Sequence, residues 1–262
     1  MSICSPHIDN KICYNKKDLL YLCNVYNQNH KDKINCNNKT KIKLFNELNK
    51  KYNKKNHYEW LKDKNISSNF YNVTIKKFKP EMPQSWVQNL NEWLSTIEIN
   101  NVLYQYEKKY NNFKFYGAVP SDCPTEIYCK LSELKINNLQ KKNKIGIVYN
   151  LDTHDKKGSH WVAVMIDLEK RVIYYFDANG IRPNRYIKKF IDNLLNNLNK
   201  SKKNKYKYIF NKKEVQKKDG QCGMFAICFI INYLKFNDFD KAINYNMNDK
   251  KMAELRREFF IN

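Results

Sequence analysis

Glycine and proline are scarce in this chain of 262 residues, with six of each. The scarcity excludes collagen-like chains and low-complexity linkers, which depend on these residues. Long apolar runs are also missing, since the longest is Met224–Ile231, far below the roughly 20 residues that a membrane-spanning helix needs. The opening residues contain no apolar stretch, so we expect no secretory signal and no membrane partner.

Cysteines are few, eight in all, and no two form a Cys-x-x-Cys pair. This density is too low for a disulfide scaffold, so we expect reduced thiols in an intracellular, reducing compartment. The amino-terminal cysteines and histidines have spacings that fit no common structural zinc site, and no metal is predicted. These residues are Cys4, His7, Cys13, Cys23, His30 and Cys36.

Acidic residues are outnumbered, 26 against 48 basic ones, which gives a net charge of +22. One interpretation is an electrostatic surface for nucleic acid or another polyanion. The other is codon bias, because only five of the basic residues are arginine and lysine is spread along the whole chain. Both interpretations stay open, and non-specific nucleic-acid binding is compatible with either.

Hydrophobic residues make up 42% of the chain and aromatic residues 14%, enough to build a packed core. Pro80 and Pro83 punctuate the chain, and we place a boundary there between an N-terminal arm, 1–79, and a catalytic domain, 80–262. Helical and strand patterns are mixed along the chain, which predicts an α+β fold. The predicted helices are 18–22, 42–48, 95–110, 186–199, 222–234 and 247–260. The predicted strands are 70–78 (or an extended linker), 144–151, 161–166, 172–176 and 206–210.

Two residues at the open end of the predicted hairpin 161–176 form the first part of a candidate site. His160 and Asp177 are symmetric about a turn centred between Leu168 and Glu169. In an antiparallel pair such residues face each other with Cβ atoms roughly 5 Å apart. A carboxylate there would fix the imidazole tautomer and stabilise the imidazolium.

Cys222 is predicted to open the apolar helix 222–234. A thiol at a helix N-terminus meets the positive end of the helix dipole, which favours the nucleophilic thiolate. Gly223 lets the backbone approach closely. The turn from Gln216 to Cys222 is expected to set the glutamine amide beside the Cys222 N–H, and two such donors form an oxyanion hole.

The order His160-Trp161, Asp177, Gln216, Cys222-Gly223 resembles that of the Ulp1-like and adenovirus-type cysteine proteases. Upstream, Trp93-Leu94-Ser95-Thr96 resembles the entry helix of that clan. The opening residues, among them Cys4-Ser5-Pro6 and Cys13-Tyr14, resemble thiol proteases of large nucleocytoplasmic DNA viruses, such as mimivirus-like enzymes and, more distantly, the African swine fever virus polyprotein protease.

The resemblance implies a papain-like-clan core with a central mixed sheet, a nucleophile at the N-terminus of a buried helix and a small, mostly helical N-terminal arm. It implies catalytic roles for His160, Asp177, Cys222 and Gln216. It further implies that Trp93 and Trp161, with Gly223, form a narrow tunnel for a Gly-Gly substrate tail. Cellular members usually carry Asp directly before the nucleophile, where this chain has Gln221.

The implied function is a cysteine endopeptidase that cleaves after glycine and processes viral core or structural polyproteins in the virion or in the cytoplasm of the infected cell. A second hypothesis is an isopeptidase acting on conjugates of SUMO or ubiquitin. A third is a basic structural virion protein that binds nucleic acid, which an intact triad disfavours. The chemistry needs no cofactor, although DNA, a cofactor of the adenovirus enzyme, is a possible stimulant.

Overall fold

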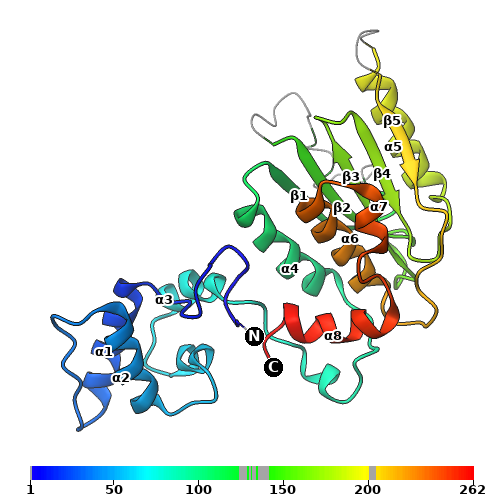
Figure 1. The fold of residues 1–262 in the computed structure, drawn as a ribbon. Helices are drawn as coiled ribbons and strands as arrows, with labels where there is room; N and C mark the ends of the chain where they lie inside the picture. The colour runs from blue at the N-terminus through cyan, green and yellow to red at the C-terminus, as the bar shows by residue number, and fades with distance from the viewer. Residues whose placement is uncertain (1, 124–128, 130, 132–133, 135–141, 201–204) are drawn as a thin grey trace. The chain divides into compact units, whose positions relative to one another are not determined.

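The computed structural model describes residues 2–123, 129, 131, 134, 142–200 and 205–262, and it divides into two compact units. The N-terminal unit comprises Met1–Lys79 with Ile261, and the C-terminal unit comprises Pro80–Phe260 with Asn262. Figure 1 traces the chain through both units. None of the described helices is long and apolar enough to cross a membrane.

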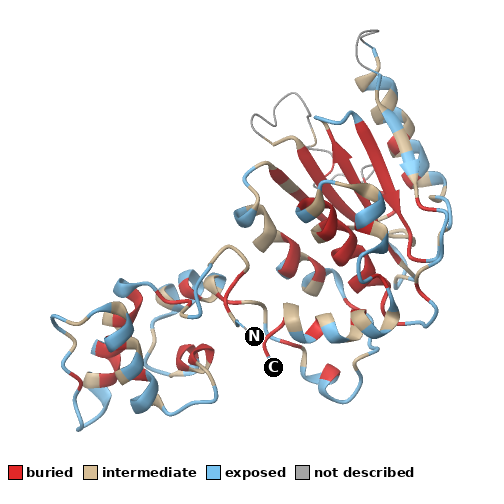
Figure 2. Cartoon of the chain, in the orientation of Figure 1, coloured by how far each residue is buried: buried red, intermediate tan, exposed pale blue. Residues whose placement is uncertain are grey.

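The N-terminal unit is helical, and its elements begin at polar caps. Asn15 and Asp18 form a capping box at the start of the first helix, and the Thr40 side chain caps the second. The helices are α1 Lys16–Asn29, α2 Lys41–Tyr52 and α3 Ser68–Thr74, and the 3-10 turns are η1 His57–Lys62 and η2 Ile75–Lys77. Their apolar faces bury a separate core, seen as red segments in Figure 2.

The predicted strand at 70–78 is wrong, because this segment forms α3 and η2. Ser67 caps the first turn by accepting a hydrogen bond from the Phe70 N–H at 3.3 Å, a local signal that outweighs the alternating pattern. Only Phe78 is extended, and it forms an isolated bridge with Cys4.

The C-terminal unit is built on a mixed five-stranded sheet in the order β1-β2-β3-β4-β5. The inner pairs, β2–β3 and β3–β4, are antiparallel, whereas the outer pairs, β1–β2 and β4–β5, are parallel. The strands are β1 Phe113–Pro120, β2 Lys144–Asn150, β3 Trp161–Asp167, β4 Val172–Phe176 and β5 Lys207–Phe210. The helices are η3 Gln84–Val87, α4 Thr96–Lys109, α5 Arg185–Leu198, α6 Cys222–Phe236, α7 Phe239–Asn244 and α8 Asp249–Phe259.

Helices cover both faces of this sheet, so the central strands are buried throughout. Alternate side chains of each strand enter different cores: Ala163 packs with α4 and α6, whereas Val164 packs with α5. The α+β prediction is confirmed, including the buried helix that begins at Cys222 and the Ser95–Glu98 capping box of α4. The layering fixes the N-terminus of α6 against the ends of β3 and β4.

The expectation of reduced thiols is wrong for six of the eight cysteines, which are paired as Cys4–Cys13, Cys23–Cys36 and Cys123–Cys129. Cys222 and Cys228 are free. The two cysteines of each pair are 6 to 13 positions apart in the sequence, so each disulfide closes a short loop. Spacing alone does not specify such pairings.

Candidate active site

The hairpin β3–β4 brings His160 and Asp177 together, with a register that differs from the predicted one. The strands pair Asp167 with Val172, so the centre of the hairpin lies one residue later than predicted. Each residue is therefore displaced by two positions relative to its predicted partner. Because a shift of two keeps a side chain on the same face of the sheet, the imidazole Nε2 still reaches the Asp177 carboxylate, at 2.7 Å.

The turn explains the displacement. Arg171 adopts a left-handed conformation with φ of 58°, and the Asp167 carboxylate accepts hydrogen bonds from the N–H groups of Glu169 and Lys170 at 3.1 and 2.9 Å. The loop therefore spans residues 168 to 171, and its centre between Glu169 and Lys170 lies one residue after the predicted centre between Leu168 and Glu169.

Asp177 is buried, and both its carboxylate and its backbone are hydrogen-bonded. Its Oδ1 accepts from His160 and from the Asn179 N–H at 2.8 Å. The Asn211 side chain accepts from the Asp177 N–H at 2.9 Å and donates to the Asp177 carbonyl at 2.6 Å. Sequence reasoning missed Asn211, whose one signal is its position directly after β5. Its two bonds fix the backbone from which the carboxylate reaches His160.

The His160 side chain is 12% exposed. Burial lowers the pKa of this imidazole, but the hydrogen bonds and charges of Asp177 and Cys222 outweigh burial and raise the pKa to about 9. Since Nε2 faces Asp177, Nδ1 is the nitrogen left for the Cys222 thiol. The arrangement stabilises an imidazolium at neutral pH.

The raised pKa predicts an alkaline limit to activity. A folded-state pKa of about 9, above the ordinary 6.5, means that the stabilisation is complete below pH 6.5 and is lost as the pH rises through about 9. We therefore expect kcat/KM to fall on the alkaline side with an apparent pKa near 9. Asp177→Asn removes the negative charge beside His160, so the alkaline limb of the pH–rate profile should move to lower pH. An alkaline pKa of kcat/KM that is the same in the variant and the wild type would contradict the role of Asp177.

Cys222 is the first residue of α6 and is 2% exposed. The side chain of Gln221, at the N-cap, makes no capping bond to the first turn. The N–H groups of this turn are therefore left to stabilise negative charge at the thiolate and at a reacting carbonyl oxygen.

Gln216 lies buried on the loop that leads to Cys222. Its Nε2 donates to the Lys218 carbonyl at 2.9 Å, and among the described residues its Oε1 has no hydrogen-bond partner. An amide nitrogen carries two hydrogens, so one remains for a substrate oxyanion. The proximity of this amide to the Cys222 N–H stays a prediction.

Arg256 of α8 binds the turn before the nucleophile. Its guanidinium is fully buried and donates to the Gly220 carbonyl at 3.0 Å, to the Glu92 carbonyl at 2.5 Å and to the Gln221 Oε1 at 3.1 Å. The Gln221 amide in turn donates to the Leu90 carbonyl at 3.0 Å. Arg256 thus joins three segments that are distant in the sequence, and sequence reasoning missed it.

Replacing Arg256 by methionine is expected to lower the free energy of unfolding by about 2–3 kcal/mol, because two carbonyls and one amide oxygen lose a charged donor. Activity should fall with it, since the Gly220–Gln221 turn carries Cys222. The exposed neighbour Arg257→Met is the matched control. Urea denaturation of both variants checks the prediction, and equal midpoints would contradict it.

Trp93 and Trp161 line one groove of about 530 Å³. The Trp161 indole is buried, with its N–H donating to the Leu94 carbonyl at 2.8 Å, whereas Trp93 is 46% exposed. A Cβ on Gly223 would lie 3.0 Å from Leu94 and 3.3 Å from Trp161. Gly223 therefore permits the close packing of Trp161 against the start of α6.

His154 also lines this groove, where Asp122 holds it through two hydrogen bonds. Its Nδ1 lies 2.6 Å from the Asp122 carboxylate, which also accepts from the His154 N–H at 3.0 Å. These two bonds tie the loop after β2 to the segment after β1.

Known proteins resemble this chain in sequence and in fold. Residues 105–262 match the model of the Ulp1 protease family, C-terminal catalytic domain. The chain is 30% identical over its whole length to R355 of Acanthamoeba polyphaga mimivirus, described as a thiol protease, and covers 94% of that protein. A crystal structure of the ASFV pS273R protease superposes with a TM-score of 0.69 at 20% identity, over 99% of this chain and 95% of that one. This last likeness shows a shared fold.

Proposed function

The chain belongs to the Ulp1 protease family and is a cysteine peptidase, and we propose that it is an endopeptidase that cleaves after glycine at Gly-Gly-Xaa sites. The observation that carries the proposal is the pair formed by the partly buried His160 and the buried Asp177 beside a cysteine at the start of a helix. The N-terminal arm, 1–79, is proposed as an accessory region and 80–262 as the catalytic domain.

In the proposed mechanism, His160 holds the proton of Cys222, and Asp177 orients the imidazole and stabilises its charge. The thiolate attacks the carbonyl carbon of the glycine, and the oxyanion is held by Gln216 and the Cys222 N–H. His160 then protonates the leaving amine. Water attacks the thioester carbon of the acyl-enzyme while His160 takes a proton from the water. The tetrahedral intermediate then collapses, the C–S bond breaks, and the product acid leaves with the Cys222 thiolate and the His160 imidazolium restored.

Selectivity for glycine is assigned to the groove that Trp93 and Trp161 line. The fixed indole of Trp161 leaves little room for a side chain beside the nucleophile. Trp93 is exposed and free to lie over an extended substrate. A Gly-Gly segment of the substrate has no side chains and therefore passes between the two rings.

The proposed substrates are viral core or structural polyproteins, cleaved in the virion or in the cytoplasm of the infected cell. The mimivirus relative, a thiol protease by its description, supports the viral context of this proposal. DNA is included as a stimulant because a net charge of +22 attracts a polyanion. Activity that is unchanged by added DNA and by salt would remove DNA from the proposal and leave the protease assignment intact.

The test compares a fluorogenic Gly-Gly-Xaa peptide with full-length SUMO and ubiquitin reporters. We expect cleavage of the peptide directly after the second glycine, identified by mass spectrometry of the products. Replacing that glycine by alanine in the peptide should reduce kcat/KM. Cleavage of the folded modifiers alone would instead support the isopeptidase. If neither is cleaved, with or without DNA, the proposed specificity is wrong.

A further inference from the structure

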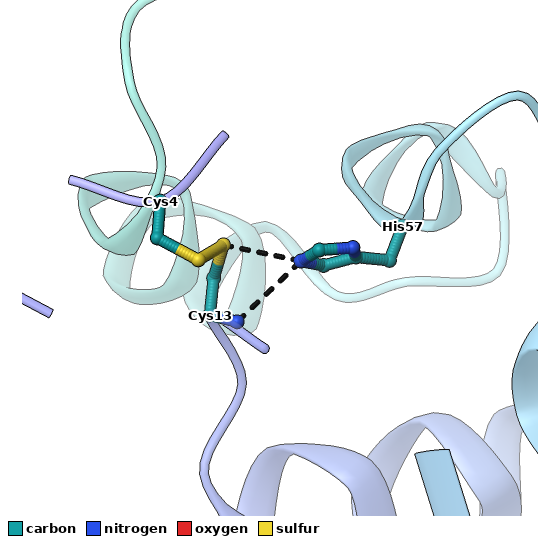
Figure 3. Close-up of side chains that lie close together, drawn as sticks. All are labelled: Cys4, Cys13 and His57. Atoms are coloured by element: carbon teal, nitrogen blue, oxygen red, sulfur yellow. Dashed lines mark hydrogen bonds between the residues drawn. A yellow bond between two sulfur atoms is a disulfide. The ribbon is translucent and has the colours of Figure 1, made fainter. Parts of the chain in front are cut away.

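Three potential metal ligands from distant positions in the sequence converge in the N-terminal unit, and none of them takes part in the proposed mechanism. Cys4, Cys13 and His57 are all buried, and their Sγ and Nε2 atoms lie within 4.8 Å of one another (Figure 3). The His57 Nε2 lies 3.1 Å from the Cys13 Sγ. Across the ranges that the structure describes, no other three His, Cys, Asp or Glu side chains have ligand atoms as close together as these.

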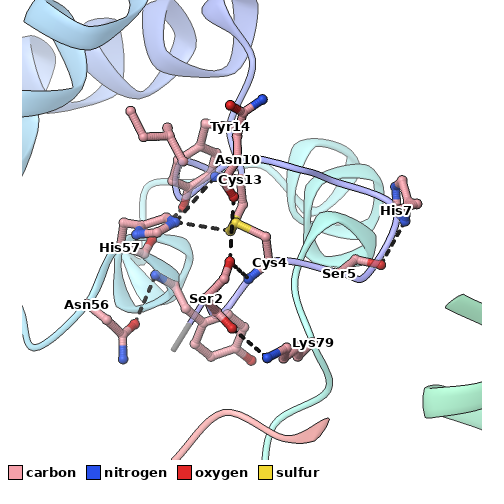
Figure 4. Close-up of a disulfide and its surroundings, with 12 residues drawn as sticks. Ser2, Cys4, Ser5, His7, Asn10, Cys13, Tyr14, Asn56, His57 and Lys79 are labelled. Atoms are coloured by element: carbon pink, nitrogen blue, oxygen red, sulfur yellow. Dashed lines mark hydrogen bonds between the residues drawn. A yellow bond between two sulfur atoms is a disulfide. The ribbon is translucent and has the colours of Figure 1, made fainter. Parts of the chain in front are cut away.

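The His57 ring is held in place by aromatic neighbours rather than by charge. The ring centroids of Phe45, Phe78 and Tyr14 lie 5.2, 5.4 and 5.6 Å from that of His57. The Tyr14 hydroxyl donates to the His57 carbonyl at 2.7 Å, and Figure 4 shows Tyr14 and His57 on the same side of the disulfide. The direction of Nε2 toward the sulfur atoms is therefore set by packing.

The Nε2 atom faces Cys13, whose backbone N–H and Sγ both lie near it. The Cys13 backbone N–H donates to Nε2 at 3.4 Å, so this nitrogen accepts and carries no proton. Cys4 and Cys13 form a disulfide here, and a disulfide sulfur has no hydrogen to offer that lone pair. Two thiolates and a neutral imidazole nitrogen would instead all direct electron pairs at a cation placed between them.

We propose that Cys4, Cys13 and His57 bind a zinc ion when the Cys4–Cys13 disulfide is reduced. Two thiolates and an imidazole are ligands that Zn²⁺ prefers, whereas Mg²⁺ and Ca²⁺ take oxygen. The two negative charges of the thiolates balance one divalent cation, which matters because uncompensated charge is costly at a buried site. The fourth position is assigned to water.

Two steps, reduction and metal binding, convert the disulfide form of Cys4 and Cys13 into the zinc-bound form. A dithiol reductant gives two electrons and two protons to the disulfide, which becomes two thiols while the reductant becomes a cyclic disulfide. Zn²⁺ then displaces the two thiol protons and forms two Zn–S bonds and one Zn–N bond. In a reducing compartment the metal would supply the cross-link that the disulfide supplies under oxidation.

Zinc would also tie together more of the chain than the disulfide does. The disulfide closes a loop between positions 4 and 13, and the metal adds His57, 44 residues beyond Cys13. Ligand binding to the folded state alone stabilises it, so zinc should raise the Tm of the reduced protein.

The second disulfide of the same unit provides a matched control. Around Cys23–Cys36, the Asn27 amide donates to the Cys36 Sγ at 3.3 Å, and the Ile34 carbonyl oxygen lies 3.5 Å from the same sulfur. Neither contact involves an imidazole. Reducing this pair therefore yields two thiols without the third ligand.

The experiment titrates the reduced full chain with ZnCl₂ alone and counts bound metal after dialysis. All samples carry Cys222→Ala, because a catalytic thiol and imidazole would themselves bind zinc. We expect one zinc ion per chain, lost in Cys13→Ser and in His57→Ala and kept in Cys36→Ser. Zinc content that is equal in all these variants, or absent from the parent, would overturn the proposal.

If Cys13→Ser or His57→Ala fails to fold, absorption spectra of the parent with bound Co²⁺ still test the proposal. Co²⁺ bound by two thiolates and an imidazole should give thiolate-to-cobalt charge-transfer absorption and the intense d–d bands of a tetrahedral site. The weak spectrum of octahedral Co²⁺ would overturn the proposal. Neither readout depends on peptidase activity, so the result stands whether or not the proposed cleavage specificity is correct.

Discussion

Replacing Cys222 by alanine is expected to lower kcat/KM for the Gly-Gly-Xaa peptide by about 10⁵–10⁶-fold, the scale at which loss of the nucleophile removes a covalent mechanism. The free energy of unfolding should change little, because alanine replaces a small buried side chain at the first position of α6. The measurement is single-turnover cleavage by purified wild type and variant at matched concentration.

Cys228 is the control for this prediction, because it is the other free cysteine and lies in the same helix. Burial raises the pKa of its thiol far above the ordinary range, so it does not supply a thiolate. Cys228→Ala should retain wild-type activity with a small loss of stability from the cavity. Activity that survived in Cys222→Ala, or vanished in Cys228→Ala, would refute the assignment of the nucleophile.

Replacing Gln216 by alanine is expected to lower kcat by about 10²–10³-fold, the cost of one missing oxyanion donor. KM should stay nearly constant, because the donor acts on charge that develops only in the transition state. The bond from Nε2 to the Lys218 carbonyl holds the amide in place while its second hydrogen serves the oxyanion. Steady-state kinetics with the same peptide gives both constants.

The exposed Gln88→Ala should leave both kinetic constants unchanged. Gln221→Ala is a sharper comparison, because this buried side chain bridges Arg256 and the Leu90 carbonyl. Its loss should reduce stability as well as rate, whereas Gln216→Ala should reduce rate alone. A variant of Gln216 that loses stability but keeps kcat would mean that the amide is structural.

Local patterns predicted much of the fold. The Ser95–Glu98 capping box set the start of α4, and the apolar run after Gln221 set α6, because each signal lies within a few residues of the feature that it determines. The hairpin register was displaced because it depends on the conformation of Arg171, which the residue type does not favour. The pairing of His160 with Asp177 survived only because the displacement was an even number of residues.

The spacing of residues along the sequence does not predict long-range contacts. Arg256 contacts Gly220 across 36 positions, and His57 contacts Cys13 across 44. Neither residue stands in a recognisable motif, so the sequence alone identifies neither. Asn211 is similar, since a polar residue at the end of a strand is common and only the fold places it beside Asp177.

The link between Arg256 and the Gly220–Gln221 turn makes activity depend on a helix that supplies no group to the proposed mechanism. The Gly220 carbonyl and the Gln221 Oε1 receive the hydrogen bonds of Arg256 only while α8 is packed against the turn. Local unfolding of α8 would therefore leave the nucleophile in a loose turn, so the docking of this helix would control the activity of the folded enzyme.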